Sequence, residues 1–374
     1  EIRLSLVGSE MCIRDRESVM RKRNKFFILC GSLCAAGLLL SVIGWVLGGR
    51  FNGVGFQPGN GLTVYSLNNT ASEGPSVLSD TIDDLDAFTS LDIQMDYADI
   101  TIQPSDHYGL EYQLVAWSAP DIQVKDGKLT VRESKQSSGQ VVFLSGFSTS
   151  FSVDWPSAKE YVTIYVPADT QLGSLTVSTS SGDTSLSALH AGDLTLVNDY
   201  GNATLTDIAC TDMDLTLNSG KFKGENLSGN TLKVTNDYGD CTLDKADIKT
   251  STDLILNSGT LKLKQAALGQ LTVTSDYGSV DMNGVTAADA SLNLNSGDMD
   301  AEAFSFRNLT VKSDYGHVDI TPVLTQTYGY DLKTDYGEIK VGSHKLGDVY
   351  YTFENEYENW IRIECSSGDI TIRN

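Results

Sequence analysis

A short motif ending in glycine returns eight times between Leu175 and Ile320, and its spacing constrains the fold more than any other sequence feature. The motif alternates between Asp-Tyr-Gly and a Ser-Gly form that is usually Asn-Ser-Gly. Successive glycines lie 19, 19, 19, 20, 19, 19 and 19 residues apart, at Gly182, Gly201, Gly220, Gly239, Gly259, Gly278, Gly297 and Gly316. A fixed period near 20 residues without a helical pattern is typical of a solenoid, whose coils pack only on their neighbours.

Apolar residues flank each glycine with a period of two. They stand two and four positions after it, as do Leu261 and Leu263, and alternate with polar residues before it, as do Leu271 and Val273. This period indicates strands with one inward face, and glycine suits a corner with positive φ. The pattern predicts an all-β parallel solenoid over residues 86–374 with about 19 residues per coil. A coil of 38 residues with two glycine corners is the alternative.

The tyrosine of each Asp-Tyr-Gly motif is the first candidate functional residue. The series is Tyr200, Tyr238, Tyr277 and Tyr315, continued irregularly by Tyr336, and Asp96-Tyr97-Ala98 resembles a degenerate first copy. If the rings face outward, they form a regular strip suited to a glycan or a protein. If they face inward, they are core spacers packed against Leu217, Leu256 and Leu294, and these leucines favour the inward arrangement.

The residue before each tyrosine or serine predicts a polar ladder. Aspartate and asparagine alternate there, as Asp199, Asn218, Asp237, Asn257, Asp276, Asn295 and Asp314. Identical carboxylates about 4.8 Å apart would repel one another, and the alternation roughly doubles their separation.

The N-terminal region predicts a membrane anchor. Residues 1–19 resemble a translated sequencing adapter, so we expect the natural protein to begin at Met20, with a basic cytoplasmic segment at residues 20–25. Residues 26–47 carry no charge and span about 33 Å as a helix, enough for one bilayer crossing. The basic flank predicts a single-pass cell-membrane protein with a cytoplasmic N-terminus and an extracytoplasmic body. A cleaved signal peptide is the alternative.

Three further segments depart from the repeat. Residues 48–85 are rich in Gly, Asn, Ser and Thr and predict a flexible linker. Residues 133–156 predict an insert with four aromatic residues, either a partner-binding or membrane-touching flap or, as we favour, a cover over the open end of the solenoid. Residues 342–374 predict a C-terminal cap, because a solenoid must protect its last strand edge.

Charge and composition restrict the chemistry. Residues 1–50 hold 8 of the 27 Lys and Arg and 4 of the 49 Asp and Glu, so the remainder carries a formal charge of -26 and should repel nucleic acid and anionic lipid. The carboxylates fall at equivalent repeat positions and the four histidines are scattered, which argues against a polysaccharide-processing enzyme and predicts no cofactor. Calcium is a weaker alternative, through Asp298 and Asp300 or the Asp ladder, although no calcium-loop signature is complete. Cys241 occupies an inward position and predicts a buried free thiol.

The segment Val162 to Pro167, the stretch Leu175 to Leu186, and the corners Ser296-Gly297-Asp298 and Ser367-Gly368-Asp369 together resemble a bacterial candidate-adhesin family of unknown function. The resemblance covers Phe88 to Asn374. It implies a single-stranded right-handed β-helix, often anchored by an N-terminal helix in Gram-positive bacteria. Because the residues show no singular catalytic cluster, we expect a non-catalytic adhesin or envelope interaction module with a cell-wall glycan or envelope protein as partner. An accessory role in envelope-stress sensing is the second functional hypothesis.

Overall fold

The structure is a computed structural model. It describes residues 32–33, 36–37, 40, 52–57, 61–66, 76–116, 118–133, 141–143, 157–323, 327–352 and 357–373. The chain divides into two compact units, Glu1–Glu73 with Ser137–Val153, and Gly74–Gln136 with Asp154–Asn374.

The first unit contains a small antiparallel sheet with the order β2-β1-β9. Its strands are β1 (Asn52–Gln57), β2 (Gly61–Ser66) and β9 (Val141–Phe143). Two strands therefore lie within the predicted linker, and the predicted insert supplies the third. Both segments hold β-branched or aromatic residues that suit strand pairing.

The predicted anchor falls mostly outside the described residues. Residues 32–33, 36–37 and 40 are helical, whereas the rest of 26–47, together with 1–19 and 20–25, is not described. Among the residues that the structure describes, no helix has the length and apolar character needed to cross a membrane.

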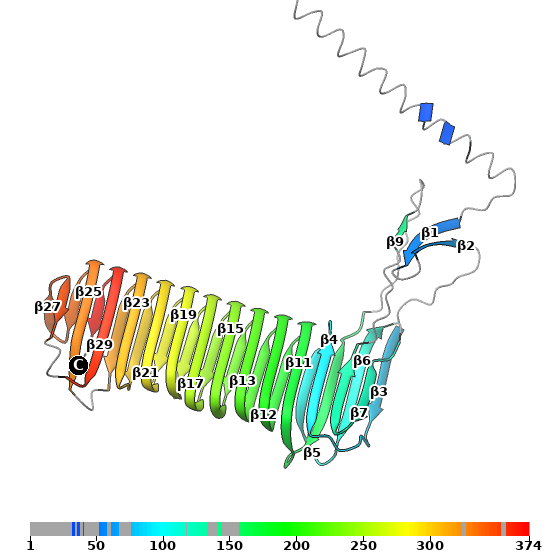
Figure 1. The fold of residues 1–374 in the computed structure, drawn as a ribbon, viewed down its shortest axis with the longest axis horizontal. Helices are drawn as coiled ribbons and strands as arrows, with labels where there is room; N and C mark the ends of the chain where they lie inside the picture. Colours follow the sequence, from blue (N-terminus) through cyan, green and yellow to red (C-terminus); the bar gives the residue numbers. More distant parts are fainter. Residues whose placement is uncertain are drawn as a thin grey trace, which may run out of the picture. The chain divides into compact units, whose positions relative to one another are not determined.

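The second unit is a continuous stack of coils (Figure 1). Each coil has a first wall that ends at the corner glycine and a second wall that begins after it. Equivalent residues of neighbouring coils pair in parallel, so that Ser219 pairs with Tyr200 on one side and with Tyr238 on the other. This register confirms one coil per 19 residues and excludes the 38-residue alternative.

Two long strands and a series of shorter ones build the walls. The long strands β12 (Thr184–Tyr200) and β13 (Ala203–Ser219) continue from a second wall into the next first wall. The other first-wall strands are β8 (Lys128–Arg132), β4 (Ser90–Met95), β11 (Gln171–Ser181), β15 (Ser228–Tyr238), β17 (Asp247–Ser258), β19 (Ala267–Tyr277), β21 (Thr286–Ser296), β23 (Asn308–Tyr315), β29 (Asn359–Ser367) and β25 (Tyr328–Tyr336). The other second-wall strands are β10 (Tyr161–Pro167), β5 (Asp99–Ser105), β14 (Phe222–Glu225), β16 (Cys241–Asp244), β18 (Leu261–Lys264), β20 (Val280–Asn283), β22 (Met299–Phe304), β24 (Val318–Pro322), β30 (Ile370–Ile372) and β26 (Ile339–Val341).

The core is a column of apolar side chains enclosed by these walls. Residues two and four positions after the glycine are buried, as predicted, and Leu261, Leu263, Val280 and Val318 have no exposed surface. Cys241 is likewise buried and free, which confirms the prediction, and burial raises the pKa of its thiol to about 12.

Antiparallel strands protect the two ends of the stack. At the N-terminal end β7 (Asp121–Lys125) pairs with β8, while β6 (Gly109–Ala116) pairs with β10 and with β3 (Ser76–Ile82). At the C-terminal end β28 (Val349–Tyr351) pairs with β25, and β27 (His344–Leu346) pairs with β26. Since β3 belongs to this sheet, the predicted linker ends earlier than residue 85.

The coil made by β29 and β30 corrects the prediction of a cap over the whole of residues 342–374. This coil lies between β23–β24 and β25–β26, although it follows both in the sequence (Figure 1). Its inward residues include Ile361, Ile363 and Ile370, all buried. Strand β29 has a complete inward face and a partner on each edge, so its coil is internal. Among the described residues of 342–374, β27 and β28 cover the end.

Candidate functional site

The tyrosines of the repeat form one exposed row along the corner of the solenoid. We name this row the tyrosine comb, and its members are Tyr97, Tyr200, Tyr238, Tyr277, Tyr315 and Tyr336. Their exposed fractions lie between 58% for Tyr238 and 81% for Tyr336. The outward alternative is therefore correct, and the favoured inward packing is wrong.

The geometry of the corner explains the error. Three positions before the glycine the side chain points inward, and Asn236, Leu256 and Ser275 are all buried. Strict alternation would also turn the residue one position before the glycine inward. The chain bends there instead, so Tyr238 and Tyr277 project into solvent while Leu217 and Leu256 remain in the core.

The coil made by β29 and β30, which we name the inserted coil, keeps the spacing of the comb regular. In the sequence, two Asp-Tyr-Gly motifs follow each other at Tyr315 and Tyr336, which breaks the alternation with serine. In the structure Ser367 pairs with both tyrosines and restores it. Tyrosine thus occupies every second coil from one end of the stack to the other, at a spacing of about 9.6 Å.

The fold itself does not require an aromatic ring at these positions. Ser219, Ser258 and Ser296 occupy the equivalent corner positions of the intervening coils, with the same strand pairing. The corner glycine N–H donates to the carbonyl of either residue, as from Gly220 to Tyr238 and from Gly239 to Ser258, at 2.9 Å in both cases.

The predicted polar ladder lies beside the comb. Asp199, Asn218, Asp237 and Asn257 are half-buried, while Asp276, Asn295 and Asp314 are exposed. The described part of the chain shows no hydrogen bond between side chains of this series. Asp314 instead accepts one from Ser366 Oγ at 3.4 Å. The series therefore supplies charge along the comb rather than a bonded ladder.

A different ladder, which the sequence analysis missed, joins the coils. Directly after the corner glycine, a side-chain acceptor receives a hydrogen bond from the backbone N–H of the equivalent residue in the next coil. The pairs are Asp183 N to Asp99 (2.9 Å), Asn202 N to Asp183 (2.8 Å), Lys221 N to Asn202 (3.0 Å), Thr260 N to Asp240 (3.2 Å) and His317 N to Asp298 (2.8 Å). The residue types at this position vary, so the sequence pattern does not reveal the ladder. The feature that they share is a short side chain that can accept a hydrogen bond.

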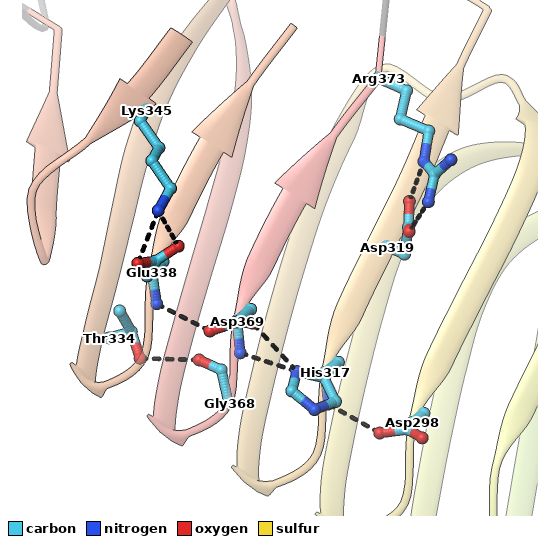
Figure 2. Close-up of polar contacts among 9 residues, drawn as sticks. All are labelled: Asp298, His317, Asp319, Thr334, Glu338, Lys345, Gly368, Asp369 and Arg373. Carbon is cyan, nitrogen blue, oxygen red and sulfur yellow. Dashed lines mark hydrogen bonds and ion pairs between the residues drawn. The ribbon is translucent and has the colours of Figure 1, made fainter. Parts of the chain in front are cut away.

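Figure 2 shows how the same contacts fix the inserted coil from both sides. Asp369 N donates to His317 Nδ1 at 3.0 Å, and Asp369 Oδ1 accepts from Glu338 N at 2.8 Å. Thr334 Oγ1 donates to the Gly368 carbonyl at 2.8 Å, and the Arg373 guanidinium binds the Asp319 carboxylate. These bonds explain why the corner, and hence the comb, continues without a break through the inserted coil.

With this geometry established, the sequence can be compared with known proteins. The profile of the family described as Toastrack DUF4097 matches residues 88–254 and 253–373, which together cover more than half of the chain. The chain belongs to the Toastrack DUF4097 family. The expected family resemblance is confirmed. The boundary between the two matches lies inside β17, so the Toastrack regions form one uninterrupted solenoid.

Solved structures share low sequence identity with this Toastrack chain. A candidate adhesin from Parabacteroides distasonis ATCC 8503 is 12% identical, with a TM-score of 0.37 and coverage of 79% of this chain and 97% of that one. A candidate lipid-binding protein from the same strain is 12% identical, with a TM-score of 0.35 and coverage of 81% and 98%. A candidate adhesin from Bacteroides fragilis NCTC 9343 is 16% identical, with a TM-score of 0.27 and coverage of 66% and 97%. No curated protein matches the sequence. Likeness at these values identifies neither a ligand nor an activity.

The second wall of the Toastrack solenoid carries a shallow groove of about 380 Å³. Asp281, Asp300 and Asp319 stand in register along it, one from each of three successive coils. Burial, followed by the neighbouring carboxylates of Asp319 and Asp281, raises the pKa of Asp300. Arg373 binds Asp319 at one end, with Nε 2.7 Å from Oδ1.

The structure also bears on the calcium alternative. Within the described ranges, no three or more His, Cys, Asp or Glu residues are placed so that they could hold a metal ion.

The raised pKa of Asp300 leads to a testable effect on stability. The folded chain holds the Asp300 proton more tightly than the unfolded chain, so this contribution to stability is lost as the pH rises through the folded pKa. Asp300→Asn cannot ionise and is expected to increase the free energy of unfolding by a few tenths of a kcal/mol at pH 7, since the site is largely solvated. The gain should vanish near pH 3, below the unfolded pKa of about 3.9.

Denaturant unfolding of wild type and Asp300→Asn at both pH values measures this difference. Asp319→Asn is the matched control and should lower stability at pH 7, because it removes the partner of Arg373. A loss of stability in Asp300→Asn at pH 7 would contradict the prediction.

Proposed function

We propose that this Toastrack protein is a non-catalytic, adhesin-like interaction module of the cell envelope, and that the tyrosine comb is its recognition surface. The predicted helix of residues 26–47 would anchor it in the cell membrane, with the solenoid outside the cell. One observation carries the proposal: tyrosine is exposed at every second coil along one corner, where serine satisfies the same backbone geometry.

The exposure of the comb tyrosines to solvent supports a binding role. Exposed aromatic rings gain little from folding, and a row of them on a soluble surface is typical of an interaction site. Tyrosine combines a rigid apolar face with a hydroxyl group and is enriched at binding hot spots. The acidic body disfavours nucleic acid and anionic lipid as partners, which leaves a cell-wall glycan or an envelope protein.

Binding by the full chain in mild detergent, measured in a pull-down with cell-wall fragments and envelope proteins, tests this function. The variant Tyr238→Ser with Tyr277→Ser replaces two rings by the residue found at the equivalent positions of neighbouring coils. We expect it to retain the wild-type circular dichroism and thermal unfolding and to lose most of the saturable binding.

Ser258→Ala, between the two replaced rings, is the matched control and should bind as wild type does. Equal binding by wild type and the folded double variant would exclude the comb as the recognition surface. Absence of saturable binding by wild type to either class of partner would count against the function itself.

A further inference from the structure

The spacing of the comb restricts the repeat distance of an extended partner. Six rings stand at every second coil over ten coil steps, so neighbouring rings are about 9.6 Å apart and the row is about 48 Å long. A polymer that contacts successive rings in the same way must repeat chemically at nearly this distance.

Among polypeptide conformations, polyproline II fits this distance best. It rises about 3.1 Å per residue with three residues per turn, so every third side chain recurs on one face at about 9.3 Å. A β-strand repeats on one face at about 6.6 Å and a helix at about 10.5 Å over seven residues. Over five ring intervals the mismatch is about 1.5 Å for polyproline II and about 4.5 Å for the helix.

The residues beside the comb set the charge of the partner. Each comb tyrosine directly follows an aspartate, and these are Asp96, Asp199, Asp237, Asp276, Asp314 and Asp335. On the other side of the glycine corner lie further carboxylates, among them Asp183, Asp240, Asp298, Glu338 and Asp369. Lys221, which lies in this second column, is already within 3.1 Å of Asp240 Oδ2.

We infer that the comb binds a basic polypeptide segment in the polyproline II conformation, with Lys or Arg at every third residue. The inference rests on the proposed function and names the partner class. Each cationic side chain would meet one tyrosine face and its preceding carboxylate, which combines a cation–π contact with an ion pair. The serine gaps between rings would leave space for the two intervening residues of each turn. Two copies of this acidic corner would repel each other, so a second copy is not the partner.

Fluorescence anisotropy of labelled peptides with the full chain tests the inference. The probe contains six Pro-Pro-Lys repeats and is about as long as the comb. A peptide of equal composition with its lysines out of this period, and one with six Pro-Pro-Glu repeats, are the controls. We expect the regular basic peptide to bind roughly tenfold more tightly than the scrambled one, and the acidic peptide not to bind.

Two comb variants make the test specific. Tyr238→Ser with Tyr277→Ser should weaken binding of the regular peptide about tenfold, since each exposed cation–π contact contributes a factor of a few. Ser258→Tyr adds a ring but fills a gap, and it should also weaken binding, whereas general aromatic affinity would strengthen it.

The outcomes separate the two proposals. Equal affinity for regular and scrambled peptides, or tighter binding by Ser258→Tyr, would overturn the inference. Tyrosine-dependent binding of a cell-wall glycan without binding of the regular peptide would overturn it while leaving the comb a recognition surface. If the regular peptide, cell-wall glycans and envelope proteins all fail to bind in a tyrosine-dependent manner, both proposals fail.

Discussion

Gly239→Ala is expected to lower the free energy of unfolding of the solenoid by about 3 kcal/mol or more. The backbone of Gly239 has φ of +148°, which a residue with a Cβ rarely adopts, and such strain costs on the order of 1–3 kcal/mol. The added Cβ would also lie only 1.9 Å from the carbonyl oxygen of Gly220 in the preceding coil. This contact is with backbone, so relief requires neighbouring coils to move apart, which strains the hydrogen bonds between them.

Gly173→Ala is the matched control. Gly173 has no left-handed backbone conformation, and a Cβ there would first meet the Thr89 carbonyl oxygen at an ordinary 3.7 Å. Its stability should change by less than about 1 kcal/mol. Denaturant unfolding with hydrogen exchange should place the Gly239→Ala defect in the two coils that contain Gly220 and Gly239, which are built by β13 with β14 and by β15 with β16. Equal stability of the two variants would show that the corner does not need glycine.

Deletion of residues 359–374 is expected to disrupt the C-terminal end of the solenoid far more than loss of a terminal coil would. Among the side chains that the deletion removes, five are at most 1% exposed, namely Ile361, Ile363, Cys365, Ile370 and Ile372. At about 1.5–3 kcal/mol each, their burial amounts to roughly 8–15 kcal/mol, which is comparable to the whole stability of a typical domain. Because the coil is internal, its loss also leaves β25 and β26 without parallel partners.

Hydrogen exchange measured by mass spectrometry localises this effect. Protection should be lost across residues 328–351 and reduced in β23 and β24, while the coils from residue 203 to 283 keep theirs, because repeats depend on their neighbours. Protection that persists in residues 328–351 would mean that β25 pairs directly with β23 after the deletion, contrary to this prediction.

A point variant separates loss of the coil from loss of chain length. Ile363→Ala should lower the free energy of unfolding by about 2–5 kcal/mol, because it opens a cavity in the inserted coil. Glu364→Ala removes an exposed neighbour on the same strand and should change stability by less than about 1 kcal/mol.

The repeat period made most of the fold predictable. The 19-residue spacing and the alternation around each glycine predicted the coil length, the corner positions and the inward side chains such as Leu261 and Val280. These features depend on residues close together in the chain, and local sequence therefore contains them.

Features that depend on distant or bent parts of the chain were harder to predict. The position of β29 follows from strand pairing across 52 residues, as between Leu309 and Ile361, which no local pattern encodes. Its signal was indirect: Tyr315 and Tyr336 follow each other without the expected serine motif between them.

The candidate site was found by its residue types but was oriented incorrectly. Leu217 and Leu256 suggested partners for the tyrosines, because strict alternation places residues one and three positions before the glycine on the same face. The corner ends that alternation. Tyr97 belongs to the degenerate copy of the motif, in which alanine replaces the corner glycine, and the pairing of β4 with β11 places it in line with the other tyrosines.

The inserted coil also imposes an order on biosynthesis. A ribosome makes residues 328–351 before residues 359–372, so the growing chain exposes the end strands before the coil that separates them from β23 and β24 exists. Coils can therefore stack in order from the N-terminus through β24. The addition of β25 and β26 to the stack must then await the synthesis of β29 and β30. Only a chain translated through β30 can align Tyr336 with the other rings, so ligand binding along the complete comb would distinguish finished molecules from prematurely terminated ones.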